Sequence, residues 1–342
     1  MTDPKMTFTY AKAGVDIRRV KRIHGDIDKL IFKTFTTRRG RFGRVLDVRQ
    51  HYAGLIDIGH GQALALHSDG VGTKVLVSLI LKKYEGVGID CVAMNVNDLI
   101  CVGAEPVALV DYLALERPNQ RLVEGVMRGL QQGALQSGVA IVSGETAIMP
   151  DVIEGFDISA TSIGIVKKTK IIEGDKTRVG DSIIGLPSTG IHSNGLTLAR
   201  KVLLKKFNRR AAEMLLTPTQ IYVKPVMKLL RSRVNVHGMA HITGGAYSKL
   251  KRIGTRAKVG FYLDNLFPPQ EVFRLIQKQG KITDREMYRT FNMGTGFLIM
   301  VPKSDEKRTL KTIPGSRVVG EVIQKQEVIV KTDSHELQIE RW

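Results

Sequence analysis

The sequence predicts two α/β or α+β domains of similar size. At 342 residues the chain is longer than one domain of ordinary size. Hydrophobic residues make up 43% and charged residues 25% of the chain, which is typical of a globular protein. Short apolar, strand-like runs alternate with runs of helical period from residue 62 to residue 168, and the same alternation resumes at residue 182.

The first half is expected to hold four strands and three helices. Apolar runs bounded by loops predict strands at 62–68, 107–115, 139–146 and 157–168. Apolar residues at helical spacing predict helices at 73–84, 89–103 and 121–138. For the middle helix we expect Asp90 as the N-cap and Gly103 at the C-terminal end. We place a domain boundary near residue 168, which gives domains at 1–168 and 169–342.

The second half opens with the same order of elements. A strand is expected at 182–187, followed by a glycine-containing loop at 188–195 and a helix at 196–207. The remaining expected elements are helices at 219–231 and 269–279, a loop at 241–250, a strand at 294–302 and closing strands within 317–331.

The two cysteines and the absence of long apolar runs limit the class of protein. Cys91 and Cys101 lie ten residues apart on one predicted helix, and this spacing separates them by about 15 Å along the axis. A disulfide between them is excluded, so we expect two buried, reduced thiols. No apolar run approaches the roughly 20 residues of a membrane span, and no signal peptide is evident. A cytoplasmic protein is the expectation.

The net charge of +19 and the pI near 9.9 allow three explanations. The charge can be an ordinary basic surface, a field that attracts polyanionic small molecules such as nucleotides, or a nucleic-acid surface. The basic residues are scattered, with short clusters at 36–44, 205–210 and 249–252. No RNA-recognition signature or zinc-finger spacing accompanies them. A nucleic-acid partner is therefore the least favoured of the three.

The stretch HSDGVGTK at 67–74 has the composition of a phosphate-binding loop, but it begins with an acid. Gly70 and Gly72 allow backbone N–H groups to approach an anion, and the helix that follows Thr73 favours negative charge at its start. The Asp69 carboxylate would repel a bare phosphate. It makes chemical sense if Mg²⁺ bridges the two, because Mg²⁺ binds one or two carboxylates together with phosphate oxygens. The structural alternative is a simple Asp-Gly turn.

The predicted helix at 89–103 supplies a second acid in an unusual place. Between residues 91 and 102 it is apolar except for Asn95, Asn97 and Asp98. A helix of this composition is expected to be buried, and an unpaired carboxylate there would cost several kcal/mol. Either a metal ion or a cationic side chain would explain Asp98. Glu145, at a strand end, is a further ligand candidate, whereas Asp111 lies in mid-strand and is expected to be structural.

Two loops of the second half carry polar groups between glycines. The first is 188–195, with His192, Ser193 and Asn194, and the second is 241–245, with His241 and Thr243. Both have the composition of anion-binding loops, although a Gly-Asn turn with a bystander histidine is more common than a binding site. The chain contains no H-E-x-x-H or G-x-S-x-G motif and no signature of a Ser/His/Asp triad.

Taken together, eight motifs in order along the chain resemble one family. They stand at 10–17, 69–74, 88–106, 143–151, 190–195, 216–226, 241–246 and 286–297. The set is similar to the phosphoribosylformylglycinamidine cyclo-ligases, or aminoimidazole ribonucleotide (AIR) synthetases, of the AIR synthetase-like ATP-binding superfamily. Eight matches in register are far more specific than any one of them.

The resemblance implies a fold and a reaction. The implied fold has two domains, and the N-terminal α/β domain forms the β-barrel-like core of a homodimer with ATP near the subunit interface. The implied reaction belongs to purine biosynthesis, and it converts formylglycinamidine ribonucleotide and ATP into AIR, ADP and phosphate through an imino-phosphate. ATP and Mg²⁺ are the implied cofactors, with K⁺ as an optional ion, and the other partner is the small ribonucleotide substrate.

The resemblance also assigns roles to residues. The implied metal ligands are Asp69, Asp98 and Glu145. The implied ATP contacts are Lys12, Gly40, Gly43, Gly70, Gly72, Thr73, Lys74 and Asn97. The implied substrate contacts are Glu145, Thr146, His192, Ser193, Asn194, Thr243, Gly244 and Gly245. The implied catalytic residues are Lys74, Asp98 and His192, and His192 is a hypothetical proton shuttle in ring closure.

The chain departs from the family pattern near its N-terminus. The family carries a glycine-rich mobile segment, which corresponds here to the arginine-rich stretch at 36–45, where Arg39 and Arg41 flank Gly40. A lysine often follows the N-terminal tyrosine directly, but here Ala11 does, and Lys12 comes one place later. Arginine can clamp phosphate directly, so these departures are compatible with ATP binding.

Three other functions fit the sequence less well. A selenophosphate synthetase would need a reactive cysteine near the N-terminus, and no cysteine precedes Cys91. A thiamin-monophosphate kinase would carry a Gly-Asp-Asp signature, which this chain lacks. A basic nucleic-acid-binding protein without catalysis is disfavoured, because carboxylates in the cleft would repel a phosphate backbone unless a metal intervened.

Overall fold

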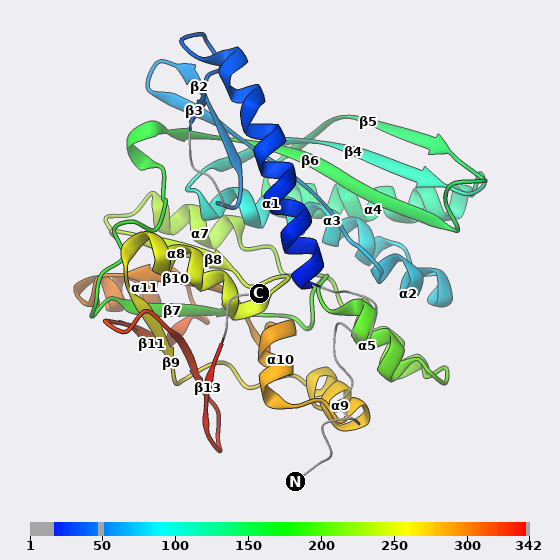
Figure 1. The fold of residues 1–342 in the computed structure, drawn as a ribbon. Helices are drawn as coiled ribbons and strands as arrows, with labels where there is room; N and C mark the ends of the chain where they lie inside the picture. Colours follow the sequence, from blue (N-terminus) through cyan, green and yellow to red (C-terminus); the bar gives the residue numbers. More distant parts are fainter. Residues whose placement is uncertain (1–16, 47–50, 340–342) are drawn as a thin grey trace.

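The computed structural model of the chain describes residues 17–46 and 51–339, and these residues form two β-sheets with helices packed against them (Figure 1). The first sheet has the strand order β1-β2-β3-β6-β4-β5, and the second has the order β13-β12-β9-β11-β7-β10-β8. The two sheets share no strand, and each is drawn from one half of the chain. The predicted α/β architecture with two domains is confirmed.

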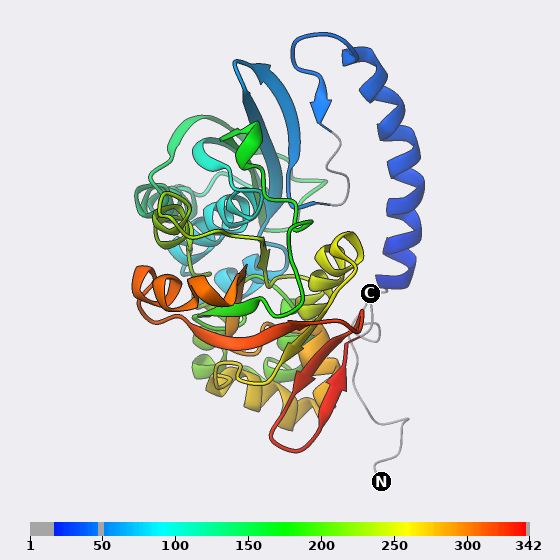
Figure 2. The ribbon, with the colours of Figure 1, turned by 90° about the vertical axis from the view of Figure 1, so that its left-hand side faces the viewer.

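The first domain contains the four predicted strands and two short additional ones. Its strands are β1 (Val45–Leu46), β2 (Gly54–Gly59), β3 (Gln62–Gly70), β4 (Glu105–Leu115), β5 (Ala140–Ile148) and β6 (Phe156–Lys167). Its helices are α1 (Ile17–Thr34), η2 (Phe35–Arg38), α2 (Lys74–Leu81), α3 (Glu85–Cys101) and α4 (Gln120–Ser137). Helix α1 stands at one side of the molecule (Figure 2). No helix within the described ranges is long and apolar enough to cross a membrane.

Helix α3 begins earlier than predicted, and the expected N-cap role of Asp90 is wrong. The helix starts at Glu85 with Tyr84 in the N-cap position, and Asp90 lies in its second turn. The Asp90 carboxylate is fully buried and pairs with Lys74 instead of capping the helix. At the other end the helix ends at Cys101. Val102 is the C-cap, and Gly103 follows it with a φ of +79°. Both cysteines are buried and free, as predicted.

Helices α3 and α4 approach each other closely at glycines. A Cβ atom on Gly129 would lie 1.9 Å from the Glu85 carbonyl oxygen. We therefore expect Gly129→Ala to lower the free energy of unfolding by about 3 kcal/mol, because two backbones would have to move apart. Urea unfolding measures this change, with Gly54→Ala as the control, since a Cβ there meets only the Leu66 carbonyl oxygen at 3.9 Å. Equal stability of the two variants would contradict the prediction.

The second domain contains the predicted strands together with several elements that were not predicted. Its strands are β7 (Ser182–Pro187), β8 (Gly238–His241), β9 (Gly260–Leu263), β10 (Thr295–Val301), β11 (Arg317–Ile323), β12 (Val328–Lys331) and β13 (Glu336–Gln338). Its longer helices are α5 (Leu196–Leu203), α6 (Arg209–Leu216), α7 (Val223–Leu230), α8 (Leu250–Ala257), α9 (Glu271–Gly280), α10 (Asp284–Thr290) and α11 (Glu306–Thr312). Short 3₁₀ turns occur at η3 (Lys168–Lys170), η4 (Ala246–Lys249) and η5 (Lys303–Asp305).

The helix predicted at 219–231 starts only at Val223, and the cause lies in the first domain. The preceding segment runs along α3, and its backbone bonds to side chains of that helix. The backbone N–H groups of Thr219 and Tyr222 donate to Asp90 and to Asn97, at 2.7 and 2.9 Å. These bonds replace the helical ones, and they join the two domains along α3.

Two surface features bear on function. Strand β5 lies at the edge of the first sheet, and nearly all its residues are exposed, including Ile141, Val142 and Ile148.

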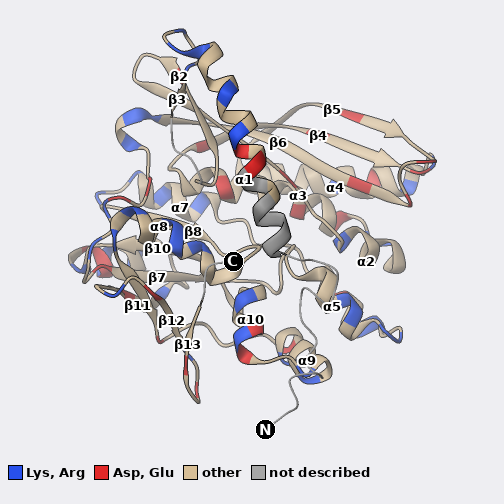
Figure 3. Cartoon of the chain, in the orientation of Figure 1, with Lys and Arg blue, Asp and Glu red and all other residues tan. Residues whose placement is uncertain are grey.

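Lysine and arginine residues are spread over helices and loops of both domains (Figure 3). Within residues 17–46 and 51–339 the charge is therefore not gathered on a single element that would serve as a nucleic-acid surface.

Candidate active site

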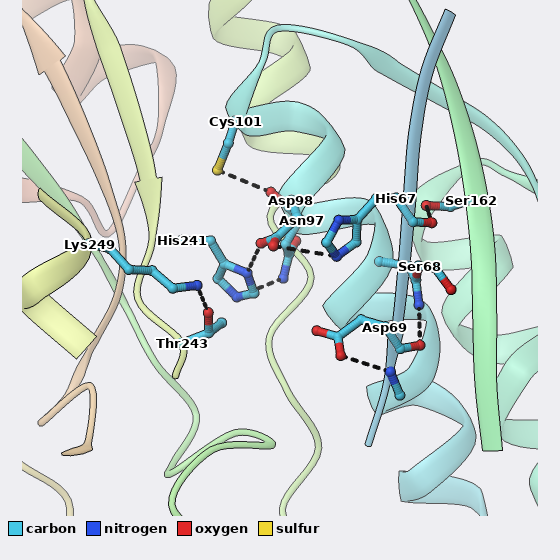
Figure 4. Close-up of polar contacts among 12 residues, drawn as sticks. His67, Ser68, Asp69, Asn97, Asp98, Cys101, Ser162, His241, Thr243 and Lys249 are labelled. Carbon is cyan, nitrogen blue, oxygen red and sulfur yellow. Dashed lines mark hydrogen bonds and ion pairs between the residues drawn. The ribbon is translucent and has the colours of Figure 1, made fainter. Parts of the chain in front are cut away.

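Several of the predicted site residues, among them Asp69, Asp98 and Thr243, converge where the end of β3, helix α3 and loops of the second domain meet (Figure 4). Asp69 belongs to β3 itself and pairs with Ala160 of β6. Its Oδ1 accepts a hydrogen bond from the backbone N–H of Gly70 at 2.8 Å. The Asn95 amide of α3 donates to the Asp69 carbonyl oxygen at 3.0 Å and ties the strand end to the helix. Burial, together with the nearby Asp98 carboxylate, raises the pKa of Asp69.

Asp98 is held from both sides by histidines. His241 Nδ1 donates to its Oδ1 at 2.7 Å, and His67 Nε2 lies 3.5 Å from its Oδ2. Burial by itself would raise the pKa of Asp98, but the Lys249 ammonium and the two histidines outweigh it and lower the value to about 2. Asp98 is therefore ionised at neutral pH. A buried carboxylate needs cationic or polar partners, and these three side chains supply them for Asp98.

Asn97, one residue earlier on α3, holds the second domain. Its Nδ2 donates to the carbonyl oxygen of Gln220 at 2.8 Å, and its Oδ1 accepts from the N–H of Tyr222 at 2.9 Å. The side chain is fully buried. Since both ends of the amide are engaged by the protein, the expected contact between Asn97 and ATP is revised to support of the segment that faces the site.

Lys74 is also fully buried, and its ammonium group points into the protein. Nζ lies 2.7 Å from Asp90 Oδ2 and donates to the carbonyl oxygens of Thr217 at 2.6 Å and His192 at 3.3 Å. These three partners occupy the three ammonium protons. The expected contact of Lys74 with ATP phosphates is therefore revised, because the side chain joins α2 and α3 to two loops of the second domain.

The loop at 188–195 reaches the first domain next to Lys74. His192 has a φ of +59°, and its Nε2 accepts hydrogen bonds from the N–H groups of Thr189 and Gln220 at 3.3 and 3.4 Å. Burial lowers its pKa well below the ordinary range, so the ring is neutral. A neutral, fully enclosed ring is poorly suited to the hypothetical role of proton shuttle, and it shapes the loop instead.

The neighbouring polar side chains of that loop differ in whether they already have a hydrogen-bond partner. Ser193 Oγ lies 3.3 Å from Thr219 Oγ1. Nδ2 of Asn194 is buried and has no hydrogen-bond partner in the part of the chain that the structure describes. Thr73, at the start of α2, contacts Thr197 at the start of α5, with 3.2 Å between the hydroxyl oxygens. The phosphate-like loop and the 188–195 loop are thus adjacent in space.

The loop at 241–245 contains Thr243, Gly244 and Gly245. Thr243 lies on the other side of Asp98 from Asp69 (Figure 4). Lys249 extends from the turn η4, and its Nζ donates to the hydroxyl of Thr243. Sequence reasoning missed this residue, since only the basic cluster at 249–252 signalled it. It also missed His67, although His67 lies two residues before Asp69 in one strand, a spacing that places both side chains on the same face.

Glu145 and Thr146 are not brought to Asp69 within one chain. Asp69, Ala160, Asp111 and Gly144 occupy one row across β3, β6, β4 and β5. Glu145 therefore points to the opposite face of the sheet. It also lies three strands from Asp69, or roughly 14 Å at the usual inter-strand spacing. Asp111 is buried, and burial raises the pKa of its carboxyl group.

The N-terminal candidates are likewise separate from the convergent residues. Gly40 and Gly43 have φ values of +70° and +75°, and the N–H of Gly43 donates to the carbonyl oxygen of Asp57 on β2 at 2.9 Å. Lys12 lies outside the described residues. Within residues 17–46 and 51–339, no group of three or more His, Cys, Asp and Glu side chains is arranged to hold a metal ion.

This arrangement defines a class of protein: a two-domain α/β enzyme in which glycine-rich loops and buried acids meet between the domains. Sequence models place it further. The model of the AIR synthase related protein, N-terminal domain, matches residues 50–166, and that of the corresponding C-terminal domain matches residues 178–333. Solved structures agree on the fold, including the hydrogenase maturation protein HypE in complex with ATP (TM-score 0.65, 20% identity, 84% of this chain and 86% of that chain).

A thiamine monophosphate kinase from Aquifex aeolicus shares the fold as well, with a TM-score of 0.63 and 21% identity over 92% of this chain and 97% of that one. The phosphoribosylformylglycinamidine cyclo-ligase of Pyrococcus furiosus is 50% identical over 89% of this chain and 91% of its own length. That of Methanosarcina barkeri is 46% identical over 92% and 95%. The chain belongs to the phosphoribosylformylglycinamidine cyclo-ligase family, the ATP-dependent AIR synthetases of purine biosynthesis, and the resemblance of its motifs is confirmed.

Proposed function

We propose that this chain uses ATP to close the imidazole ring of AIR at the site between its two domains. The observation that carries the proposal is the position of Asp98, an ionised, buried acid located between the phosphate-like loop of the first domain and the 241–245 loop of the second. In the proposed reaction the formyl amide oxygen of formylglycinamidine ribonucleotide attacks the γ-phosphorus of ATP, and ADP leaves. The amidine nitrogen then attacks the activated carbon, the ring closes and phosphate departs.

The protein has little covalent work in such a reaction, since phosphoryl transfer depends mainly on positioning and charge neutralisation. Gly70, Gly72 and Thr73 are proposed to face the triphosphate at the start of α2, where the helix dipole favours an anion. The ribonucleotide contacts are proposed on the facing loops, from Ser193, Asn194 and Thr243 to Gly245. The unpartnered Nδ2 of Asn194 supports this assignment, because a buried donor needs an acceptor.

Mg²⁺ is proposed to bind between Asp69 and Asp98. The fit rests on the electrostatics of the pair: the Asp98 carboxylate raises the pKa of Asp69, which means that the two acids repel each other across the site. A divalent cation would relieve this repulsion, and Mg²⁺ needs only one or two carboxylates when phosphate oxygens complete its shell. When bound, the ion would neutralise phosphate charge. K⁺ is an optional addition to the assay.

We further propose a homodimer that forms through β5. An exposed edge strand presents unpaired backbone groups, and β5 adds Ile141, Val142 and Ile148 to it, next to the exposed Val110 and Tyr112 of β4. A second copy that pairs its own sheet with this one would cover these groups. It would also enclose Glu145 and Thr146, which could then join a site formed by two chains.

The dimer proposal predicts that Val142→Lys shifts the chain toward a monomer. We expect the dissociation constant of the dimer to rise at least about tenfold, because a lysine buried in the interface would lack a partner. Sedimentation velocity over a concentration series measures it. Leu135→Lys on the exposed outer surface of α4 is the matched control and should leave the assembly unchanged. A monomeric wild-type chain, or identical assembly of both variants, would refute the proposal.

The test of the function is ADP release with and without formylglycinamidine ribonucleotide, together with direct detection of AIR. The wild-type chain should release ADP only with the substrate present, and in equal amounts to AIR. No substrate-dependent turnover in Mg²⁺ and K⁺ would overturn the proposal. Thiamin monophosphate is tested in the same assay, because thiamin-monophosphate kinase is the alternative activity. Salt-dependent retention of oligonucleotides that is unaffected by Asp69→Ala would favour the nucleic-acid alternative.

Two further expectations stay proposals. The boundary near residue 168 is supported by the end of β6 at Lys167 and by the beginning of the second sheet at Ser182. A cytoplasmic location is supported by the substrates, because ATP and ribonucleotides are metabolites of that compartment.

A further inference from the structure

We infer that Lys249 binds a phosphate group of a substrate from the second-domain side of the site. The inference rests on the proposed function and extends it, since it names a further positioning residue and the chemistry that the residue recognises. Lys249 lies opposite Asp69, and the side chains of His241 and Asp98 lie between the two (Figure 4).

The position of the ammonium group is set by its neighbours. Lys249 ends the turn η4, and its side chain extends back to the Thr243 hydroxyl, which accepts one hydrogen bond from Nζ. Nζ also lies 5.2 Å from the centre of the Tyr52 ring. Tyr52 is 5% exposed, and its hydroxyl has no hydrogen-bond partner within the described ranges. The ammonium is thus held in place with two of its three protons unused.

No carboxylate of the described residues lies within ion-pair distance of Lys249 Nζ, although Asp98 is nearby. Asp98 Oδ1 accepts a hydrogen bond from His241 Nδ1 at 2.7 Å, and its Oδ2 lies 3.5 Å from His67 Nε2. A partly buried ammonium that has no carboxylate within contact distance is costly. Burial accordingly lowers the pKa of Lys249, even though Asp98 raises it in part. Asp98 therefore attracts the ammonium only at longer range, and we assign its direct ionic contact to a bound substrate.

A phosphate group fits this role better than any other anion in the proposed reaction. Both substrates carry phosphate, and a lysine ammonium binds it as a compact point charge. Two sources are available: the γ-phosphate of ATP, which becomes the transferred group, and the 5′-phosphate of the ribonucleotide. The chemistry of Lys249 is the same in either case.

The test compares Lys249→Met with the wild-type chain in two binding experiments by calorimetry. ATP against ADP isolates the γ-phosphate, and AIR against its dephosphorylated riboside isolates the 5′-phosphate. We expect the variant to lose at least tenfold in affinity for either ATP or AIR, with no change for the partner that lacks the phosphate. Lys249→Arg should restore part of the loss, because it keeps the charge.

The controls separate this role from a structural or general electrostatic one. Lys251→Met removes the same charge two residues further along, in the first turn of α8, and should change neither affinity. If the thermal midpoint of Lys249→Met falls well below that of the wild-type chain, Lys249→Gln replaces it. Unchanged affinities for both ATP and AIR would overturn the inference. A wild-type chain that binds these ligands without forming AIR would overturn the proposed function instead, and the comparison would still report on Lys249.

Discussion

Replacing Asp98 by asparagine is expected to lower kcat for AIR formation by about a thousandfold, the scale on which a preorganised charge in an enclosed site contributes to catalysis. Asparagine has nearly the same size as aspartate and can still accept the hydrogen bond from His241 Nδ1. The substitution therefore removes the charge and little else. Without that charge the site loses one of the two carboxylates proposed to hold Mg²⁺.

The measurement is the steady-state rate of AIR formation over a range of Mg²⁺ concentrations, with circular dichroism and sedimentation as checks on the fold and the assembly. Asp111→Asn is the matched control, because Asp111 is a buried acid of the same domain, on strand β4, that the mechanism does not use. It should retain near-normal activity. A rate for Asp98→Asn within tenfold of the wild-type chain would refute the proposed role of this carboxylate.

Replacing Lys74 by methionine is expected to lower the free energy of unfolding by roughly 3–5 kcal/mol, as for other buried ion pairs that lose one partner. Lys74 and Asp90 both have fully buried side chains, 2.7 Å apart at Nζ and Oδ2. Methionine fills a similar volume but leaves the Asp90 carboxylate without a cation. The carbonyl oxygens of Thr217 and His192 lose their donor in the same step.

Urea unfolding of the single and double variants separates charge from packing. Lys74→Met combined with Asp90→Asn should be more stable than Lys74→Met alone, since the asparagine oxygen can still accept from Thr219. A double variant no more stable than the single one would show that the charge of Asp90 is not the cause. Activity should fall in Lys74→Met as well, because the pair joins the phosphate-like loop to the loop at 188–195.

Much of the fold was predictable from local pattern. Strand β7 lies where the apolar run at 182–187 placed it, and β3 and α4 differ from prediction by at most two residues at either end. Periodicity and glycine positions act over a few residues, so they are readable in one sequence. The motifs were likewise sufficient to place the chain in its family.

The partners of the buried polar side chains were not predictable in this way. Lys74 has the sequence context of a phosphate ligand. It pairs instead with Asp90 on the neighbouring helix, and it donates to two carbonyl groups that lie more than a hundred residues away in the chain. Asn97 shows the same effect, since the second-domain segment at 217–222 consumes both ends of its amide. Glu145 has the sequence context of a ligand group at a strand end, but the sheet places it on an exposed outer face.

The sequence by itself determined the main strands and helices of the first domain, the two-domain class, the family and the loops where substrates are expected to bind. The tertiary structure alone decided which of the acids and bases face one another: His67 and His241 on Asp98, Lys249 beside Thr243, and Lys74 inside the domain junction. The physical reason is that a charged group takes its protonation state and its role from its burial and its nearest counter-charge. Packing between residues far apart in the chain sets both of these.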